Sequence, residues 1–527
     1  MIFVIGSGPA GVACASALLD GGEKVTMLDA GLELERGRRR QRASLQSRPS
    51  TSWDKESLGF LRDGVEVTRE GIPVKLAYGS DFPYRDPIGH PGSSEGAYSK
   101  PSFARGGLSN VWGASVLPYR TEDMTDWPIT AEDLAPHYRA ALAMMPFSAR
   151  HDGLEEEFPL HHDSPGALGS SSQAEALLRD LDQSAAVLAS RGVRFGASRL
   201  AVQAEGAGGK PGCVHCGKCI YGCPYEFIYN SAHTLERLRE NSAFSYRPGV
   251  VVQRLAEVDS QVEVLARHVD RGSTLRMRAD RVFVAGGVFN TARITLASMD
   301  AFDEPLHALD NCYFLMPMVR YQGRPEVLNE RLHTLAQVFI EMGDPALGPH
   351  RAHLQVYTYN ELFQEEVERV LGPFHRALPM VKRGMLSRLL LIQGYLHSDL
   401  SARIRLVLRR EFGEEEPSLD LAGEPNPQTR PALTAIHRRL WSERGLLRAV
   451  PVSQMMRVGL PGRGFHTGGT FPMKAKPARL QTDVLGRLHG FTRVHIVDAS
   501  VFPSLPATTI TLSVMANAHR IGSAALA

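Results

Sequence analysis

Four of the six cysteines lie within eleven residues, and thiolates spaced in this way can bind iron or zinc. The run C-x2-C-x2-C-x3-C-P has the spacing of a bacterial iron–sulfur site, and its members are Cys213, Cys216, Cys219 and Cys223. Because the sequence has no second run, Cys223 closes the same cluster, gives its place to Cys312, or leaves a three-cysteine site. We favour a [4Fe–4S] cluster; a [3Fe–4S] cluster, a zinc ion and an unmetallated group of thiols remain as alternatives.

The N-terminal residues have the pattern of a dinucleotide-binding unit. An apolar strand at residues 1–5 is followed by Gly6-x-Gly8-x-x-Gly11, an alanine-rich helix and a second strand that ends at Asp29. Gly6 permits a tight turn, Gly8 lets a pyrophosphate approach the main chain, and Gly11 lets helix and strand pack closely. Asp29 can accept a hydrogen bond from a ribose hydroxyl. The pattern predicts a bound dinucleotide but does not distinguish NAD from FAD.

Two further stretches are expected to border the same cofactor. Residues 105–113 form a glycine-rich turn that lets the main chain approach a ligand, and its candidate contacts are Gly106, Gly107, Ser109 and Asn110. Short strands are expected at residues 250–255, 261–267 and 275–279, before a buried strand at 282–285 returns the chain to the nucleotide-binding sheet. Val252 and Gly286 in these strands are also candidate cofactor-binding residues.

The C-terminal stretch carries the candidate acid–base chemistry. His466 begins the sequence HTGGT, and an imidazole can exchange a proton near neutral pH, although one histidine alone is a weak indication. A strand over residues 494–497 ends at Asp498 and Ala499, which are candidate cofactor contacts, and a last helix is expected over residues 512–527.

Length and composition exclude several classes of protein. A chain of 527 residues is expected to form two or more domains. A net charge of +2 gives no indication of nucleic-acid binding. No apolar run reaches the roughly eighteen residues of a membrane span, so no transmembrane segment is expected. The cysteines do not form a disulfide framework, and we expect a reducing, cytoplasmic location.

The element pattern changes after residue 310. Alternating apolar and polar residues indicate a half-exposed antiparallel sheet, with strands expected at 313–321, 332–342, 352–359, 389–398 and 403–408 and a helix at 361–371. A basic run at residues 36–42 is expected to be a solvated loop. We therefore predict an α/β chain: residues 1–310 mainly bind the dinucleotide, with the cysteine loop inserted at 205–230, 311–460 mainly form an α+β substrate domain, and 461–527 return to the first domain.

Several stretches together resemble the glucose–methanol–choline (GMC) oxidoreductases, which are FAD enzymes that oxidise alcohols. The resemblance covers residues 6–29, 106–113, 127–134, 282–287 and 466–518. It implies a Rossmann-type FAD-binding domain joined to a substrate domain built on an antiparallel sheet. It also implies that Asp29 binds the adenosine ribose, that Asp498 and Ala499 contact the flavin chain, and that His466 is the catalytic base. Some relatives attach FAD to a histidine where this chain has Val111, so we expect non-covalent FAD.

One position departs from the family pattern. The family places a second histidine or asparagine where this chain has Thr509, and a threonine hydroxyl cannot act as a base near neutral pH. Thr509 remains a candidate catalytic residue, but His466 is expected to be the main acid–base group. The cysteine run is similar to that of members that pass electrons to cytochromes or similar carriers.

These observations predict a FAD-dependent dehydrogenase that oxidises a CH–OH group of a small-molecule alcohol. Hydride passes to the flavin, and electrons leave through the iron–sulfur cluster to a one-electron acceptor protein. A reductase that runs in the opposite direction with a one-electron donor protein, an alcohol oxidase that uses oxygen, and a redox-inactive flavin-binding partner protein are the alternatives.

Overall fold

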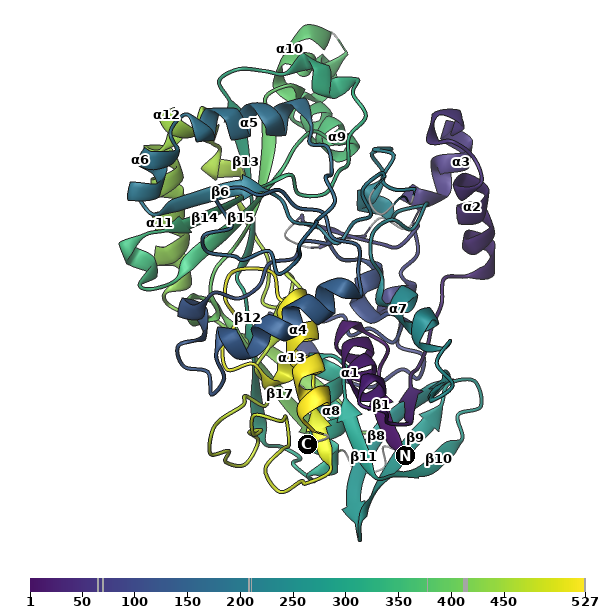
Figure 1. The fold of residues 1–527 in the computed structure, drawn as a ribbon. Helices are drawn as coiled ribbons and strands as arrows, with labels where there is room; N and C mark the ends of the chain where they lie inside the picture. Colours follow the sequence, from purple (N-terminus) through teal and green to yellow (C-terminus); the bar gives the residue numbers. More distant parts are fainter. Residues whose placement is uncertain are drawn as a thin grey trace.

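A parallel sheet of five strands forms the lower part of the molecule in the computed structural model, which describes residues 1–63, 66–68, 71–206, 209, 211–376, 378–410 and 416–525 (Figure 1). The strand order is β22–β11–β1–β2–β7, and all neighbours run parallel. The strands are β1 (Ile2–Ile5), β2 (Val25–Leu28), β7 (Phe244–Arg247), β11 (Arg281–Val284) and β22 (Val494–Ile496). The sheet therefore joins N-terminal, central and C-terminal segments, and it includes the strand at 282–285 that was expected to return to it.

Two layers cover this parallel sheet, which explains why its strands are apolar on both faces. Ile2, Val4 and Met27 share a core with α1 (Pro9–Asp20) and α13 (Thr511–Ala524). The alternate residues, such as Phe3, Ile5 and Leu28, share a second core with an antiparallel three-stranded sheet. Its strands are β8 (Val250–Val258), β9 (Gln261–His268) and β10 (Thr274–Ala279).

An antiparallel sheet of seven strands forms the upper part of the molecule, and we call it the substrate sheet (Figure 1). Its order is β19–β13–β16–β15–β14–β6, with β20 beside β13. The strands are β6 (Val193–Ala197), β13 (Tyr313–Arg320), β14 (Val338–Gly343), β15 (Arg351–Tyr357), β16 (Leu389–Tyr395), β19 (Ala449–Pro451) and β20 (Arg457–Val458).

The two faces of the substrate sheet differ. Even-numbered residues of β13–β16 enter an apolar core together with α5 (Ser172–Asp182) and α11 (Thr429–Ser442). Because side chains alternate along a strand, the odd-numbered residues lie on the opposite face. That face carries polar side chains, which include Glu341, His353, Gln355 and Gln393.

A third sheet has the order β21–β12–β17–β18–β5. Its strands are β5 (Ser94–Glu95), β12 (Pro305–Asp310), β17 (Arg403–Arg409), β18 (Ser418–Glu424) and β21 (Thr467–Gly468), and β3 (Glu66–Val67) pairs with β4 (Pro73–Val74) elsewhere. The remaining helices are α2 (Arg36–Gln46), α3 (Lys55–Gly59), α4 (Ala131–Ala143), α6 (Ala185–Ser190), α7 (Ser231–Leu238), α8 (Val288–Ser298), α9 (Glu361–Leu371), α10 (Pro379–Leu386) and α12 (Arg444–Leu447).

The basic run at residues 36–42 was expected to be a loop, and this prediction was wrong. The run lies inside helix α2, which has only one buried side chain, Leu45. A helix that is polar around almost its whole circumference lacks the apolar period by which helices are recognised in a sequence. Within the described residues, no helix combines the length and the hydropathy that a bilayer-spanning segment requires.

Candidate active site

The first glycine motif is shaped by close main-chain contacts. Gly6 has a φ of +95°, and a Cβ there would lie 2.5 Å from the carbonyl oxygen of Ala285. A Cβ on Gly11 would lie 1.9 Å from the carbonyl oxygen of Gly6, so strand, turn and helix α1 fit only without side chains. A Cβ on Gly8 would meet no atom within 4 Å. Gly8 thus borders open space at the helix N-terminus, where a phosphate can approach.

Asp29 lies at the end of β2 beside this motif and is buried. Its Oδ2 accepts hydrogen bonds from the hydroxyls of Ser7 and Tyr246, the second at 2.9 Å. Burial raises the pKa of the Asp29 carboxyl to about 6, and these hydrogen bonds oppose the rise. Asp29, Gly6, Val252 and Gly286 line one pocket, so the structure brings together four residues that the sequence placed at a cofactor.

The second glycine loop touches the first. A Cβ on Gly107 would lie 3.2 Å from the Cα of Gly8, and the Gly106 N–H donates to the Ser7 hydroxyl at 2.9 Å. The side chains of Ser109 and Asn110 donate to main-chain carbonyls of the loop itself, Ser109 to Gly106 and Asn110 to Arg105 and Gly107. Ser109 and Asn110 therefore hold the shape of the loop, and its main chain faces the first motif.

Asp498 also organises main chain. Its carboxylate accepts from the Gly287 N–H at 2.8 Å, the Thr291 hydroxyl at 2.5 Å and the Ser500 N–H at 3.0 Å, which fixes the N-terminus of α8. Burial raises the pKa of Asp498, and these hydrogen bonds oppose the rise. The Ala499 carbonyl accepts from the Gly469 N–H at 2.9 Å, so this strand end holds the HTGGT loop.

His466 stacks on Tyr395 of the substrate sheet, with ring centroids 4.6 Å apart and planes at 19°. Burial lowers the pKa of His466 to about 3, with a smaller contribution from the nearby His353. The Nδ1 atom of His466 is buried without a hydrogen-bond partner among the described residues. The same holds for the hydroxyls of Thr470, in the same HTGGT loop, and of Ser500 and Thr508 further along the C-terminal stretch. Buried polar atoms are normally paired, so this group of atoms is suited to a polar ligand.

Thr509 is buried and its hydroxyl oxygen accepts from the Leu117 N–H at 3.1 Å. This bond ties the C-terminal segment to the stretch that follows the second glycine loop. The hydroxyl can still donate one hydrogen bond, but it has no tendency to accept a proton near neutral pH. A catalytic role for Thr509 stays a prediction.

The sequence reasoning missed a group of polar residues on the substrate sheet. Glu341 on β14 and His353 on β15 are opposite each other in register, both are almost inaccessible to solvent, and Oε1 of Glu341 lies 2.5 Å from Nδ1 of His353. The ring of Tyr395 neighbours both histidines, with its centroid 6.3 Å from that of His353 and 4.6 Å from that of His466. The alternation in 351–357, RAHLQVY, was the available signal, because it places charged and amide side chains on one face.

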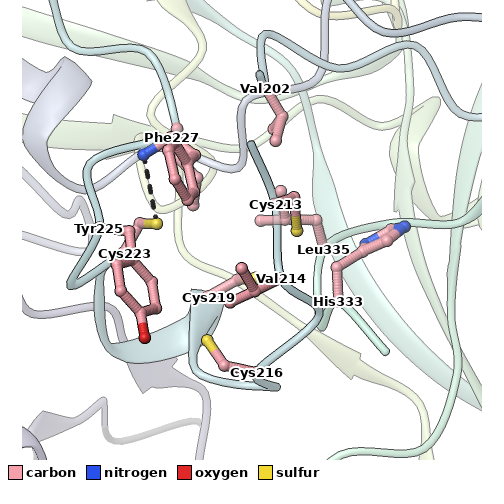
Figure 2. Close-up of a pocket in the computed structure, with 11 residues that line it drawn as sticks. Val202, Cys213, Val214, Cys216, Cys219, Cys223, Tyr225, Phe227, His333 and Leu335 are labelled. Atoms are coloured by element: carbon pink, nitrogen blue, oxygen red, sulfur yellow. Dashed lines mark hydrogen bonds between the residues drawn. The ribbon is translucent and has the colours of Figure 1, made fainter. Parts of the chain in front are cut away.

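The four cysteines of the run line one pocket, together with Tyr225, Phe227 and His333 (Figure 2). The Phe227 N–H donates to the sulfur of Cys223 at 3.4 Å. Among the described residues, the only group of three or more metal-ligand side chains with ligand atoms within 4.8 Å of one another is His350, His397 and Asp399. The cysteine sulfurs are thus not gathered as tightly as one tetrahedral ion requires, and the iron–sulfur prediction is not confirmed by this arrangement.

The cysteine loop nevertheless continues directly into contacts with the second glycine loop. The Trp112 indole donates to the Tyr229 carbonyl at 2.8 Å, and Nδ2 of Asn230 donates to the Asn110 side chain at 2.7 Å. Lys75 connects the same two places, since its Nζ donates to the Trp112 carbonyl at 2.7 Å and it interacts electrostatically with Cys219 and Cys223. Burial lowers the pKa of Lys75 to about 8, and no carboxylate in the described part of the chain pairs with it.

Comparisons with known proteins agree with this architecture. Residues 447–518, which contain His466, Asp498 and Thr509, match a family model described as GMC oxidoreductase. The whole chain is similar in structure to pyridoxine 4-oxidase from Mesorbium loti, with a TM-score of 0.58 and 15% identity over 99% of this chain and 98% of the other. It is also similar to a formate oxidase variant from Aspergillus oryzae RIB40, studied for FAD modification, with a TM-score of 0.55 and 12% identity over 99% and 97% of the two chains.

No curated protein sequence shows significant similarity to this chain. The structural likeness confirms the predicted fold, a mixed α/β molecule in which a Rossmann-type domain is joined to a substrate domain built on a sheet. The C-terminal segment is of the GMC oxidoreductase type.

Proposed function

We propose that the protein is a GMC-type, FAD-dependent dehydrogenase that oxidises a CH–OH group of a small-molecule alcohol. One observation carries the proposal: His466 lies in the segment that matches the GMC family model, and its buried Nδ1 has no partner within the described residues. A histidine in this state is available to a ligand. A histidine that has only a structural role normally pairs both ring nitrogens in hydrogen bonds or exposes one of them to solvent.

The residues around the two glycine loops are suited to FAD. Gly8 leaves space for a pyrophosphate, Asp29 can accept from a ribose hydroxyl, and Val252 and Gly286 would border the adenosine. Val111 offers no atom for a covalent link, so FAD is bound non-covalently in this proposal. When bound, FAD supplies the two-electron acceptor for the hydride.

The burial of His466 determines its role. With a pKa lowered to about 3, its imidazole is unprotonated at neutral pH and can accept the proton of a substrate hydroxyl. Tyr395 holds the ring plane by stacking, so the ring presents its nitrogens in a fixed direction. Thr509 contributes at most one hydrogen bond.

We further propose that the electrons leave through an iron–sulfur cluster, [4Fe–4S] or [3Fe–4S], to a one-electron acceptor protein. Two observations favour this second step: the cysteines share one pocket, and their loop contacts the second glycine loop through Trp112. Lys75, a half-buried cation without a carboxylate partner in the described residues, favours an anionic group between them. The low cysteine count outside the run favours a reducing, cytoplasmic location.

The first experiment is anaerobic mixing of the purified protein with candidate alcohols while the flavin absorbance is followed. Bleaching of the flavin supports the dehydrogenase, whereas a flavin that no alcohol reduces favours a redox-inactive flavin-binding partner protein. Reoxidation of the reduced flavin by oxygen at a rate that sustains turnover identifies an oxidase. Turnover only from a reduced donor protein toward a carbonyl compound identifies the reductase.

The second experiment separates the cluster from the flavin. Cys216→Ala should remove iron and the broad visible absorption, leave flavin reduction by the alcohol intact, and abolish turnover with a one-electron acceptor protein. Cys14→Ala is the matched control, because Cys14 is a buried cysteine of helix α1 outside the run. Zinc in place of iron, or full turnover after complete loss of iron, contradicts the electron path and leaves the flavin chemistry untouched.

A further inference from the structure

A chain of buried hydrogen bonds crosses the polar face of the substrate sheet. It begins at Glu341 and His353, whose Oε1 and Nδ1 are 2.5 Å apart. It continues from Nε2 of His353 to Nε2 of Gln355 at 3.2 Å, and the Gln355 Oε1 accepts from the hydroxyl of Tyr357 at 3.4 Å. Burying a carboxylate, an imidazole and an amide costs free energy even when they are paired, and an apolar set would fill the same space. The packing of the sheet alone therefore does not account for them.

The chemistry of these groups fixes which atom donates and which accepts in each hydrogen bond from Glu341 to Tyr357. A carboxylate only accepts, so Nδ1 of His353 carries the proton that Glu341 binds, and Nε2 is left as an acceptor. The amide nitrogen of Gln355 donates to that Nε2, which turns the amide oxygen toward Tyr357. The Ser115 hydroxyl donates to the same oxygen at 3.4 Å. Tyr357 thus gives its only proton to the sheet and keeps its oxygen lone pair free.

The chain ends at the second glycine loop. The Tyr357 oxygen lies 3.6 Å from the place that a Cβ on Gly113 would occupy, and Ser115 follows that loop by two residues. Tyr357 is half-buried, whereas Glu341, His353 and Gln355 are almost fully buried, so Tyr357 is the member that a small molecule can reach. At its other side, His353 lies next to Tyr395, on which His466 stacks. The hydrogen-bond chain thus connects Tyr357, beside the second glycine loop, with the rings of Tyr395 and His466.

We propose that Glu341, His353 and Gln355 are positioning residues that orient Tyr357, and that the Tyr357 oxygen accepts a hydrogen bond from a hydroxyl of the alcohol substrate. This inference rests on the proposed dehydrogenase function. It assigns to the substrate sheet an acceptor for the substrate, whereas Thr509, whose oxygen already accepts from the Leu117 N–H, can only donate. The substrate then carries two hydroxyls: a non-reacting one donates its proton in a hydrogen bond to the Tyr357 oxygen, and the reacting one gives its proton to His466.

A double-mutant cycle on flavin reduction tests whether the chain acts as one unit. Tyr357→Phe removes the acceptor and should raise the half-saturating alcohol concentration and lower the reduction efficiency by roughly tenfold, the effect of one hydrogen bond. Gln355→Leu should act in the same direction by about three- to tenfold. The double variant should be no worse than Tyr357→Phe alone, because residues that act through one another are not additive. Glu341→Gln should resemble Gln355→Leu.

Controls separate positioning from folding. FAD content should be unchanged in Tyr357→Phe and Gln355→Leu. The thermal unfolding midpoint should be unchanged in Tyr357→Phe and lowered in Gln355→Leu, which leaves Nε2 of the buried His353 without a donor. These two variants suffice if Glu341→Gln does not fold. Tyr119→Phe is the matched control, since its buried hydroxyl has no partner among the described residues, and flavin reduction should stay within about twofold. Multiplicative losses in the double variant, or an unchanged half-saturating concentration in Tyr357→Phe, overturn the positioning role alone. A flavin that no alcohol reduces in the unsubstituted protein overturns the proposed function and this inference together.

Discussion

Gly8 and Gly11 lie three residues apart, yet the structure predicts opposite consequences when a methyl group is added to each. In Gly8→Ala the new Cβ meets no protein atom within 4 Å, and Gly8 has a φ of −64°, which alanine adopts freely. The free energy of unfolding of the apoprotein should therefore change by no more than about 0.5 kcal/mol. In Gly11→Ala the Cβ would lie 1.9 Å from the Gly6 carbonyl oxygen, so the helix or the turn must move. Such overpacking costs about 1–3 kcal/mol.

The order of the two variants should be different for FAD affinity than for stability, because Gly8→Ala weakens FAD binding although it barely affects unfolding. The methyl group of Gly8→Ala occupies the space that a pyrophosphate needs, so at least one charge-assisted hydrogen bond to the helix N-terminus is lost. One such bond contributes about 1.5–3 kcal/mol, which corresponds to about 10–150-fold in affinity. Denaturant unfolding of the apoproteins and titration with FAD measure the two quantities separately. A Gly8→Ala protein that keeps full affinity, or that is destabilised as strongly as Gly11→Ala, would refute the placement of the pyrophosphate.

Two further predictions concern acid–base groups. His466→Ala should slow flavin reduction by the alcohol by about 10²–10⁴-fold with FAD still bound, whereas Thr509→Ala should slow it on the order of tenfold. Stopped-flow mixing measures both rates, and a larger loss in Thr509→Ala would contradict the assignment of His466 as the main base. Because burial raises the pKa of Asp29 to about 6, the native apoprotein keeps a proton that the unfolded chain releases near pH 4. Its stability should therefore fall by about 3 kcal/mol as the pH rises from 4 to 6, and denaturation of Asp29→Asn should lack this fall; equal slopes in both proteins contradict the burial argument.

Local patterns in the sequence were sufficient for the elements whose contacts are local. The unit from β1 to Asp29 has the predicted strand–glycine–helix–strand order, and helix α9 spans the predicted residues 361–371. The strands at 250–279 also formed close to the predicted limits. In each case the determining interactions, an apolar period, a cap or a turn, lie within one segment.

Features that depend on distant partners were not predictable in the same way. Strand β6, far from the other strands of the substrate sheet in sequence, pairs with β14 in that sheet, and the Glu341–His353 pair depends on the register between β14 and β15. No period within one strand specifies which strand lies beside it. The division of the chain at residues 310 and 460 stays a prediction. Strand β6 shows that at least one segment before residue 310 belongs to the substrate sheet.

The alternation of the substrate sheet separates two kinds of change that evolution or engineering can make. Even-numbered positions of β13–β16 hold the apolar core, so substitutions there create cavities or strain. Odd-numbered positions such as Gln355, Tyr357 and Gln393 contribute nothing to that core. These three side chains can be exchanged without loss of that core, and among the described contacts none of them touches His466, which is held by Tyr395 and precedes β21 of the third sheet. The fold thereby permits a new substrate to be accepted without a new scaffold.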